Sequence, residues 1–84
     1  MRNPGTLGQP LTSGQIAALR LAADGYTSRQ IAARLSTTEQ GIHQRLKDAT
    51  RRLGARSRTH AVILALQQGA IHLNELDSSD RGAA

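Results

Sequence analysis

Hydrophobic positions recur with the period of an α-helix along most of the chain, and the clearest example is residues 37–54. The apolar residues there are spaced four, three and four positions apart, which forms one stripe of a 3.6-residue period. The stripe consists of Ile42, Leu46, Ala49 and Leu53. The opposite side carries the amide and cationic side chains of Gln40, His43, Gln44, Lys47 and Arg51. The pattern therefore predicts one amphipathic helix with a buried stripe and a basic exposed face.

The limits of this helix follow from its flanking residues. Thr38 is the preferred N-cap, and Thr37 with Gln40 forms a competing capping box one residue earlier. Gly54 ends the helix. The sequence therefore predicts a helix at about residues 38–53.

An earlier helix is predicted at residues 11–24, and a capping box marks its start. Thr12 is the expected N-cap, with Gln15 three residues later as its partner. Gly25 ends the helix in the left-handed conformation that glycine favours. The expected buried side consists of Ile16, Leu19, Leu21, Ala22 and Ala23.

A short helix at residues 27–35 lies between these two, and it begins with the same signature. Thr27 and Gln30 repeat the capping box. Its expected apolar stripe consists of Ile31, Ala32 and Leu35. The helices at residues 27–35 and 38–53 are joined by a short turn, and the second is basic on its exposed face. This arrangement indicates a helix-turn-helix.

A fourth helix is predicted at residues 58–68, with Ser57 as N-cap and Gly69 at its end. This helix is apolar nearly all round. The side expected to pack on the other helices consists of Ala61, Val62 and Ala65. Ile63 and Leu66 would then face outward as a dimer interface, although in so small a domain they could also be ordinary core residues.

The predicted class is therefore all-α, with four helices in one domain at residues 11–71. Residues 1–10 contain both prolines and are expected to form a flexible arm. Residues 72–84 are polar and acidic and are expected to be a disordered tail. A chain of 84 residues buries only roughly 60% of its extended-chain surface, so association with a second copy would add useful buried area.

Positive charge is concentrated in the middle of the chain. Residues 26–60 hold eight Lys or Arg side chains against two carboxylates, a local net charge of +6 within a total of +5. Such a patch predicts a polyanionic partner, with nucleic acid as the first choice and an acidic protein or membrane surface as the second. No apolar run is long enough to span a membrane, and the N-terminus lacks the apolar core of a signal peptide. We expect a cytoplasmic protein with no membrane partner.

Enzyme and metal chemistry find no support in the sequence. The chain has no cysteine, and its three histidines are far apart and on different predicted elements. There is no Gly-rich phosphate loop in a strand-helix context and no nucleophile constellation. We expect no catalysis, no metal, no cofactor and no small-molecule substrate.

An ordered set of short motifs spans residues 11–71 and resembles the LuxR/GerE-type DNA-binding domain. The set combines a Leu-Thr start, a helix-ending Gly, an Ile-Ala-x-x-Leu element, a Thr-Glu turn entry, a basic-Leu-Gly element and an Arg-Ser-Arg-Thr run. The matching residues are Leu11-Thr12, Leu19, Gly25, Ile31-Ala32, Leu35, Thr38-Glu39, Arg52-Leu53-Gly54, Arg56 to Thr59 and Ala61-Val62. The resemblance implies a four-helix domain whose third helix enters the major groove and whose last helix forms dimers.

The chain departs from the usual pattern of this family at several positions. Members usually carry Glu in place of Gln15, Thr-Val in place of Gly41-Ile42, often His in place of Arg45, and Glu or Gln in place of His60. Gly41 removes a side chain from the surface that would face DNA, which either permits a closer approach to the groove or weakens binding. Only ten residues precede the domain, so the sensor or receiver domain of most members is expected to be absent.

The resemblance also implies which residues contact DNA. The candidates for base edges are Gln40, His43, Gln44 and Lys47. The candidates for phosphates are Thr12, Thr27, Arg29, Thr38, Arg51, Arg52 and Arg58. For Arg34 and Arg52, plain surface solubility is an equal alternative. Asp48 would repel phosphate unless it is paired, for example with Arg45, Arg51 or Arg52.

The sequence thus favours a sequence-specific DNA-binding transcriptional regulator that acts as a homodimer on a two-fold related site. An alternative is a protein-interaction module of the same fold that binds another regulator or an RNA polymerase subunit through its apolar fourth helix. A third possibility is architectural or non-specific nucleic-acid binding.

Overall fold

Four α-helices make up the chain in the computed structural model, which describes residues 8–73, and no strand occurs in that range. The helices are α1 (Ser13–Ala23), α2 (Ser28–Arg34), α3 (Glu39–Leu53) and α4 (Arg58–Gln67). The predicted all-α class and the order of four helices are confirmed. The first seven residues of the expected arm, and nearly all of the expected acidic tail, lie outside the described residues.

Reciprocal capping boxes begin both α1 and α2, as their sequences predict. The Thr12 hydroxyl accepts from the backbone N–H of Gln15 at 3.1 Å, and the Gln15 side-chain oxygen accepts from the N–H of Thr12 at 3.0 Å. Thr27 and Gln30 make the same pair of bonds at 3.1 and 2.9 Å. Each box satisfies two donors that a helix start leaves unpaired, and loss of such a cap costs about 1 kcal/mol.

The limits of α3 are set by Thr38 and Gly54. The Thr38 hydroxyl accepts from the N–H of Gly41 at 2.9 Å, so Thr38 and not Thr37 is the N-cap. Gly54 closes the helix with φ of 70°, in the left-handed region where a side chain would be strained. The predicted helix at about residues 38–53 is therefore confirmed to within one residue.

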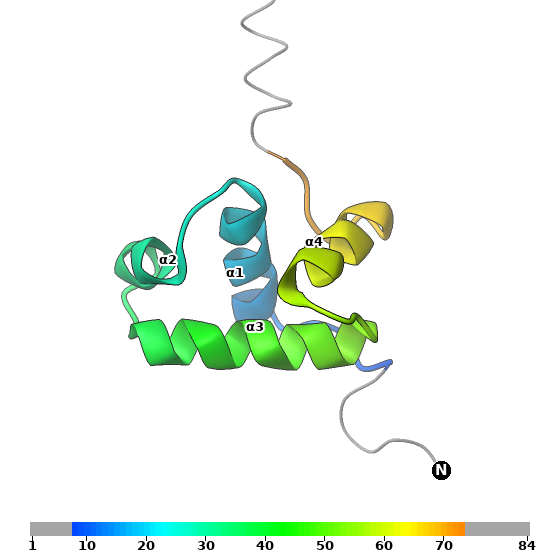
Figure 1. Ribbon diagram of the computed structural model, residues 1–84, viewed down its shortest axis with the longest axis horizontal. Coiled ribbons are helices and arrows are strands. Elements are labelled where there is room, and N and C mark those ends of the chain that lie inside the picture. The colour runs from blue at the N-terminus through cyan, green and yellow to red at the C-terminus, as the bar shows by residue number, and fades with distance from the viewer. Residues whose placement is uncertain (1–7, 74–84) are drawn as a thin grey trace, which may run out of the picture.

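α3 packs against each of the other three helices, whereas α2 and α4 do not pack on each other. Figure 1 shows α3 along the lower edge of the molecule with α1, α2 and α4 above it. Of its predicted stripe, Ile42, Leu46 and Ala49 are buried, and Leu53 is half-buried against the core. The side of α3 away from the other helices is left open to solvent.

The core is made largely of small and aliphatic side chains. Ala61 and Ala65 are fully buried on α4, as predicted, while Val62 and Leu66 are half-buried against the core. Leu66 therefore does not face fully outward as the sequence suggested, but Ile63 is 45% exposed. Several buried residues were not expected. They are Gln15, Ala18, Ser28 and Ile71.

Residues 8–10 run beside the end of α3. The N–H of Gly8 donates to the carbonyl oxygen of Arg52 at 3.1 Å, and the Arg52 guanidinium donates to the carbonyl oxygen of Pro10 at 2.6 Å. This short stretch is thus tied to α3 by hydrogen bonds in both directions.

Replacement of Ile42 by Val tests whether Ile42 is buried, through the loss in the free energy of unfolding. Ile42 is fully buried at the centre of the α3 stripe, so loss of one methylene should cost about 0.5–1.5 kcal/mol in the free energy of unfolding. Ile63→Val is the matched control, and because Ile63 is 45% exposed and outside the buried core, it should cost less than Ile42→Val. Urea denaturation of both variants measures the difference, and equal losses would contradict the assigned rotation of the helices.

Candidate nucleic-acid interface

The exposed face of α3 is a continuous polar surface opposite the buried stripe. All five polar residues that the sequence placed on this face are exposed. They are Gln40, His43, Gln44, Lys47 and Arg51. Since α3 is fixed by contacts on three helices, this face keeps one orientation relative to the rest of the domain.

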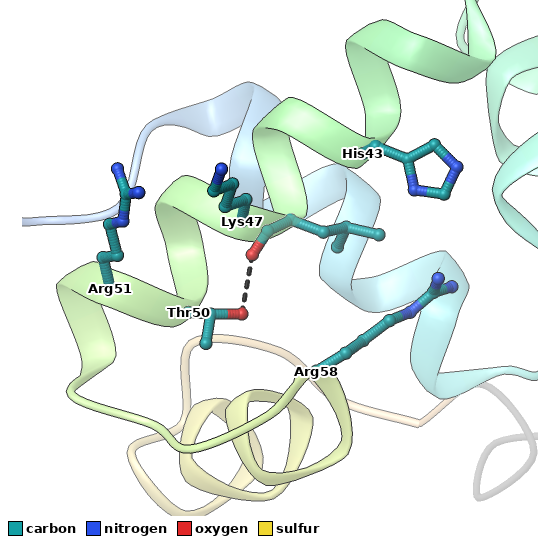
Figure 2. Close-up of a pocket in the computed structure, with 6 residues that line it drawn as sticks. His43, Lys47, Thr50, Arg51 and Arg58 are labelled. Atoms are coloured by element: carbon teal, nitrogen blue, oxygen red, sulfur yellow. Dashed lines mark hydrogen bonds between the residues drawn. The ribbon is translucent and has the colours of Figure 1, made fainter.

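A cationic hollow of 380 Å³ lies beside the second half of α3. It is lined by His43, Leu46, Lys47, Thr50, Arg51 and Arg58. Figure 2 shows the side chains of Lys47 and Arg51 projecting from α3, with that of Arg58 reaching across from the start of α4. The Thr50 hydroxyl donates to the carbonyl oxygen of Leu46 at 2.7 Å and forms part of the wall (Figure 2).

Lys47 and Arg51 have no paired counter-charge among the residues that the structure describes. Within residues 8–73, neither side chain makes an ion pair or a hydrogen bond. Two cations side by side without a counter-charge repel one another and attract an anion from solution. The cationic hollow therefore has the charge and the open donors that a phosphate group requires.

Arg58 joins α4 to the start of α2, two helices that do not pack on each other. Its guanidinium donates to the hydroxyl of the buried Ser28 at 3.0 Å and lies 3.5 Å from the carbonyl oxygen of Tyr26. A guanidinium has five N–H donors, so these two bonds leave others for a phosphate. Arg58 thus both holds one wall of the cationic hollow and keeps charge available inside it.

A second hollow, of 390 Å³, lies over the first half of α3. It is lined by Glu39, Gln40, His43, Gln44 and Lys47. This amide hollow mixes donors and acceptors, and its one carboxylate offsets its one lysine. His43 and Lys47 line both hollows and separate them. A mixed set of donors and acceptors suits the edges of bases, whereas an all-donor set suits phosphates.

Both acidic residues of α3 face polar neighbours on this surface. A carboxylate oxygen of Glu39 lies 3.6 Å from Nε2 of His43, one helical turn away. Asp48 accepts a hydrogen bond from Nε2 of Gln44 at 3.1 Å. The arginines that the sequence offered as partners for Asp48 are not used, since its partner is the amide one turn earlier.

The remaining candidates for phosphate contact lie in different settings. Thr12, Thr27 and Thr38 are exposed N-caps whose hydroxyl oxygens accept from the helix, which leaves each O–H free to donate. Arg29 is exposed on α2. Arg52 is half-buried and its guanidinium is bonded to Pro10, so the structure does not bring it into the cationic hollow.

Two other arginines serve the packing of the domain. The guanidinium of Arg34 stacks 4.2 Å from the centre of the Tyr26 ring, which fixes it against the turn before α2. Arg45 of α3 is half-buried and contacts α1, because a Cβ atom on Gly14 would be 3.4 Å from the Cζ of Arg45. Sequence reasoning missed this contact, because no local spacing relates positions 14 and 45.

Gly41 makes room for the cap of α3. A Cβ atom at this half-buried position would lie 3.0 Å from the Thr37 hydroxyl and 3.1 Å from the Thr38 hydroxyl, closer than ordinary van der Waals contact. The packing of the α3 N-terminus therefore favours glycine at position 41, apart from any effect that a side chain there would have on the exposed face.

Residues 8–73 contain no group of three His, Cys, Asp or Glu side chains that could hold a metal ion. No helix in the same range is long and apolar enough to cross a membrane.

Comparison with known proteins identifies relatives of the chain among bacterial regulators. It is 36% identical over 64 residues to the transcriptional regulatory protein YdfI of Bacillus subtilis (strain 168), which covers 76% of this chain and 30% of YdfI. It is 36% identical over 64 residues to the HTH-type transcriptional regulator AlkS of Pseudomonas putida, covering 76% of this chain and 7% of AlkS. It is 38% identical over 58 residues to the nitrate/nitrite response regulator protein NarP of Escherichia coli (strain K12), covering 69% and 27% of the two chains.

The chain thus spans less than a third of the length of these relatives. The solved structure of the transcription factor GerE has the same fold, with a TM-score of 0.69 at 20% sequence identity, over 76% of this chain and 97% of that one. The model of the bacterial regulatory proteins of the luxR family, GerE, matches residues 9–65. The chain therefore belongs to the luxR family of bacterial regulatory proteins and carries the family's helix-turn-helix domain at residues 9–65.

Proposed function

We propose that this protein binds a specific duplex DNA site as a homodimer and regulates transcription by occupying that site. Membership of the luxR family supports the DNA-binding regulator. The observation that carries the proposal is the cationic hollow, in which the exposed Lys47 and Arg51 pair with no carboxylate of residues 8–73. Such a regulator acts in the cytoplasm, where the bacterial chromosome lies, and nothing in the proposal requires catalysis or a cofactor.

In this proposal the first half of α3 contacts base edges in the major groove. The residues assigned to bases are Gln40, His43, Gln44 and Lys47, which line the amide hollow. A glutamine amide matches the donor and acceptor of adenine, and a lysine matches the acceptors of guanine. These four residues share one exposed face of α3, so all of them reach the groove in a single approach of the helix.

Phosphate contacts surround this face. Arg51 and Arg58 supply charge from the cationic hollow, and Arg29 supplies it from α2. Hydroxyls and backbone N–H groups at the starts of α1, α2 and α3 add donors through the caps Thr12, Thr27 and Thr38. Arg52 is half-buried beside residues 8–10 and lines neither hollow, so we place it last among the phosphate contacts.

The homodimer is proposed to form through α4. Ile63 is the large hydrophobic side chain that the described part of the chain leaves exposed, and the half-buried Leu66 lies one turn further on. Full burial of an isoleucine contributes about 1.5–3 kcal/mol, and the 45% of Ile63 that is exposed would add roughly half of that in each copy, which favours a self-complementary contact. Two copies related by a two-fold axis would then present two α3 helices to two half-sites.

The exposed Ile63 also favours a second candidate function. The same apolar surface of α4 could bind another regulator or a subunit of RNA polymerase, with α3 contributing little DNA specificity. The two functions differ in what the purified chain binds. A preferred duplex in a binding selection supports the first, whereas a stoichiometric complex with polymerase and no preferred duplex supports the second.

Replacement of Lys47 by Ala tests the assignment of a base contact. Specific binding should weaken by roughly 1–3 kcal/mol if Lys47 contacts a base, with relaxed preference at one base pair of each half-site. Fluorescence anisotropy on the selected duplex and its single-base variants measures both effects. Unchanged affinity and preference would remove Lys47 from the interface.

Arg51→Ala tests the phosphate contact through its dependence on salt. The slope of log affinity against log salt concentration should become shallower by about 0.9, because one fewer counterion is released, and all duplexes should weaken alike. Arg20→Ala is the matched control, since Arg20 is an exposed arginine on α1 outside both hollows and should leave the slope unchanged. Equal slopes for the wild type and Arg51→Ala would exclude the proposed contact.

Ile63→Asp tests the dimer. A charge in place of the exposed isoleucine should weaken self-association by at least tenfold, or about 1.4 kcal/mol, in sedimentation velocity. The monomer should remain folded in urea denaturation, because Ile63 is already 45% exposed and lies outside the buried core. Gln67→Ala, an exposed change on the same helix, is the control. A wild-type chain that stays monomeric at high concentration contradicts the proposed dimer.

A further inference from the structure

Gln44 and Asp48 form a side-chain hydrogen bond across one turn of the exposed face of α3. The amide nitrogen Nε2 of Gln44 donates to Oδ1 of Asp48 at 3.1 Å. Gln40, the other glutamine of the amide hollow, makes no such bond within residues 8–73. Gln44 is thus distinguished from Gln40 by a fixed partner.

This partner restricts the orientation of the amide. The last torsion of a glutamine side chain is broad and roughly two-fold, so its oxygen and nitrogen ends exchange easily. An ionised carboxylate only accepts hydrogen bonds. Asp48 therefore stabilises the orientation that turns Nε2 toward it, and in that orientation Oε1 of Gln44 points away from Asp48, with the second amide N–H left unused.

The Oε1 atom and the second N–H of the Gln44 amide, which Asp48 leaves unused, match one base better than the others. Adenine presents a donor at N6 and an acceptor at N7 in the major groove, whereas guanine presents acceptors at both O6 and N7. An amide that offers one acceptor and one donor pairs with both groups of adenine. Against guanine, the same fixed Oε1 would meet the acceptor O6.

We infer that Asp48 is a specificity-determining positioning residue, which orients the Gln44 amide so that Gln44 selects adenine over guanine at the base pair it contacts. The inference rests on the proposed function, because it assumes that α3 enters the major groove of a specific site. Asp48 itself contacts no base.

The negative charge of Asp48 gives this role a recognisable signature. Asp48 lies on α3 between Lys47 and Arg51, and it reduces the attraction of this surface for every phosphate, whatever the DNA sequence. Its removal should therefore strengthen binding to unrelated DNA while it weakens discrimination at one base pair. A residue that only stabilised the helix would not change these two quantities in opposite directions.

The test uses the whole chain, a duplex obtained by binding selection, and the variant Asp48→Asn. Asparagine has nearly the same size but both donates and accepts, so either orientation of Gln44 is satisfied. The base pair is first located as the one at which Gln44→Ala loses preference. There we expect a preference for adenine over guanine of about tenfold in the wild type. It should fall by about twofold or more in Asp48→Asn, because a glutamine–aspartate pair one turn apart is weak in water.

Two controls separate orientation from charge. Glu39→Gln removes one negative charge from the same face, and because Glu39 faces His43 it should strengthen binding without changing the preference at the Gln44 base pair. The double variant Asp48→Asn, Gln44→Ala should show no further loss of preference beyond Gln44→Ala. An unchanged preference for adenine over guanine in Asp48→Asn overturns the inference. So does a loss of preference on adding Asp48→Asn to Gln44→Ala that equals the loss it causes in the wild type.

A measurement on the free protein gives an independent outcome. In nuclear magnetic resonance spectra, the Gln44 side-chain amide proton that donates to Asp48 should lie downfield and move to an ordinary position in Asp48→Ala. An unmoved signal overturns the fixed orientation. A wild-type chain with no preferred duplex refutes the proposed function itself, whereas a preferred duplex that Gln44→Ala binds with unchanged preferences refutes this inference alone.

Discussion

Burial of one face of α3 against three other helices is the constraint on which the rest of the structure depends. Ile42, Leu46 and Ala49 occupy successive turns and contact the core, which fixes the rotation of α3 about its own axis. Because successive residues of a helix are about 100° apart, the same rotation decides which side chains face outward. A stripe of three residues therefore orients the whole polar surface proposed to contact DNA.

Small residues make this arrangement possible in so short a chain. Ala61 and Ala65 of α4 are fully buried and let its backbone approach the rest of the domain closely. The core holds no phenylalanine or tryptophan, so its cohesion comes from close contact and not from large aromatic groups. Hydrogen bonds at the helix ends fix where the helices begin and end. The bond from Arg58 to Ser28 connects α4 with α2, two helices that do not pack on each other.

The sequence predicted the helices well because their signals are local. Thr12 with Gln15, and Thr27 with Gln30, are three residues apart, so the box they form depends on little beyond the helix itself. Features that depend on the path of the chain were not predictable in this way. The burial of Ile71 and the contact of Arg45 with Gly14 both arise from segments brought together only after folding.

The proposed interface shows the same division between local and distant signals. The exposed face of α3 followed from its period, whereas the cationic hollow required Arg58 to arrive from α4, 11 positions after Lys47. Arg52 illustrates the limit of charge counting. It adjoins Arg51 in sequence, yet the residue is half-buried and its guanidinium is bonded to Pro10, because the next position on a helix lies about a quarter-turn away.

The placement of the two carboxylates on α3 bears on the balance between affinity and specificity. Had Asp48 paired with Arg51, one turn of the surface would have lost a charge available to phosphate. Instead Asp48 accepts from Gln44 and Glu39 faces His43, so within residues 8–73 neither carboxylate pairs with a cation of the hollow. Phosphate attraction is shared by every DNA sequence, whereas an oriented amide distinguishes one base from another. Two negative charges on an otherwise basic face thus lower general affinity while they order the side chains on which discrimination would depend.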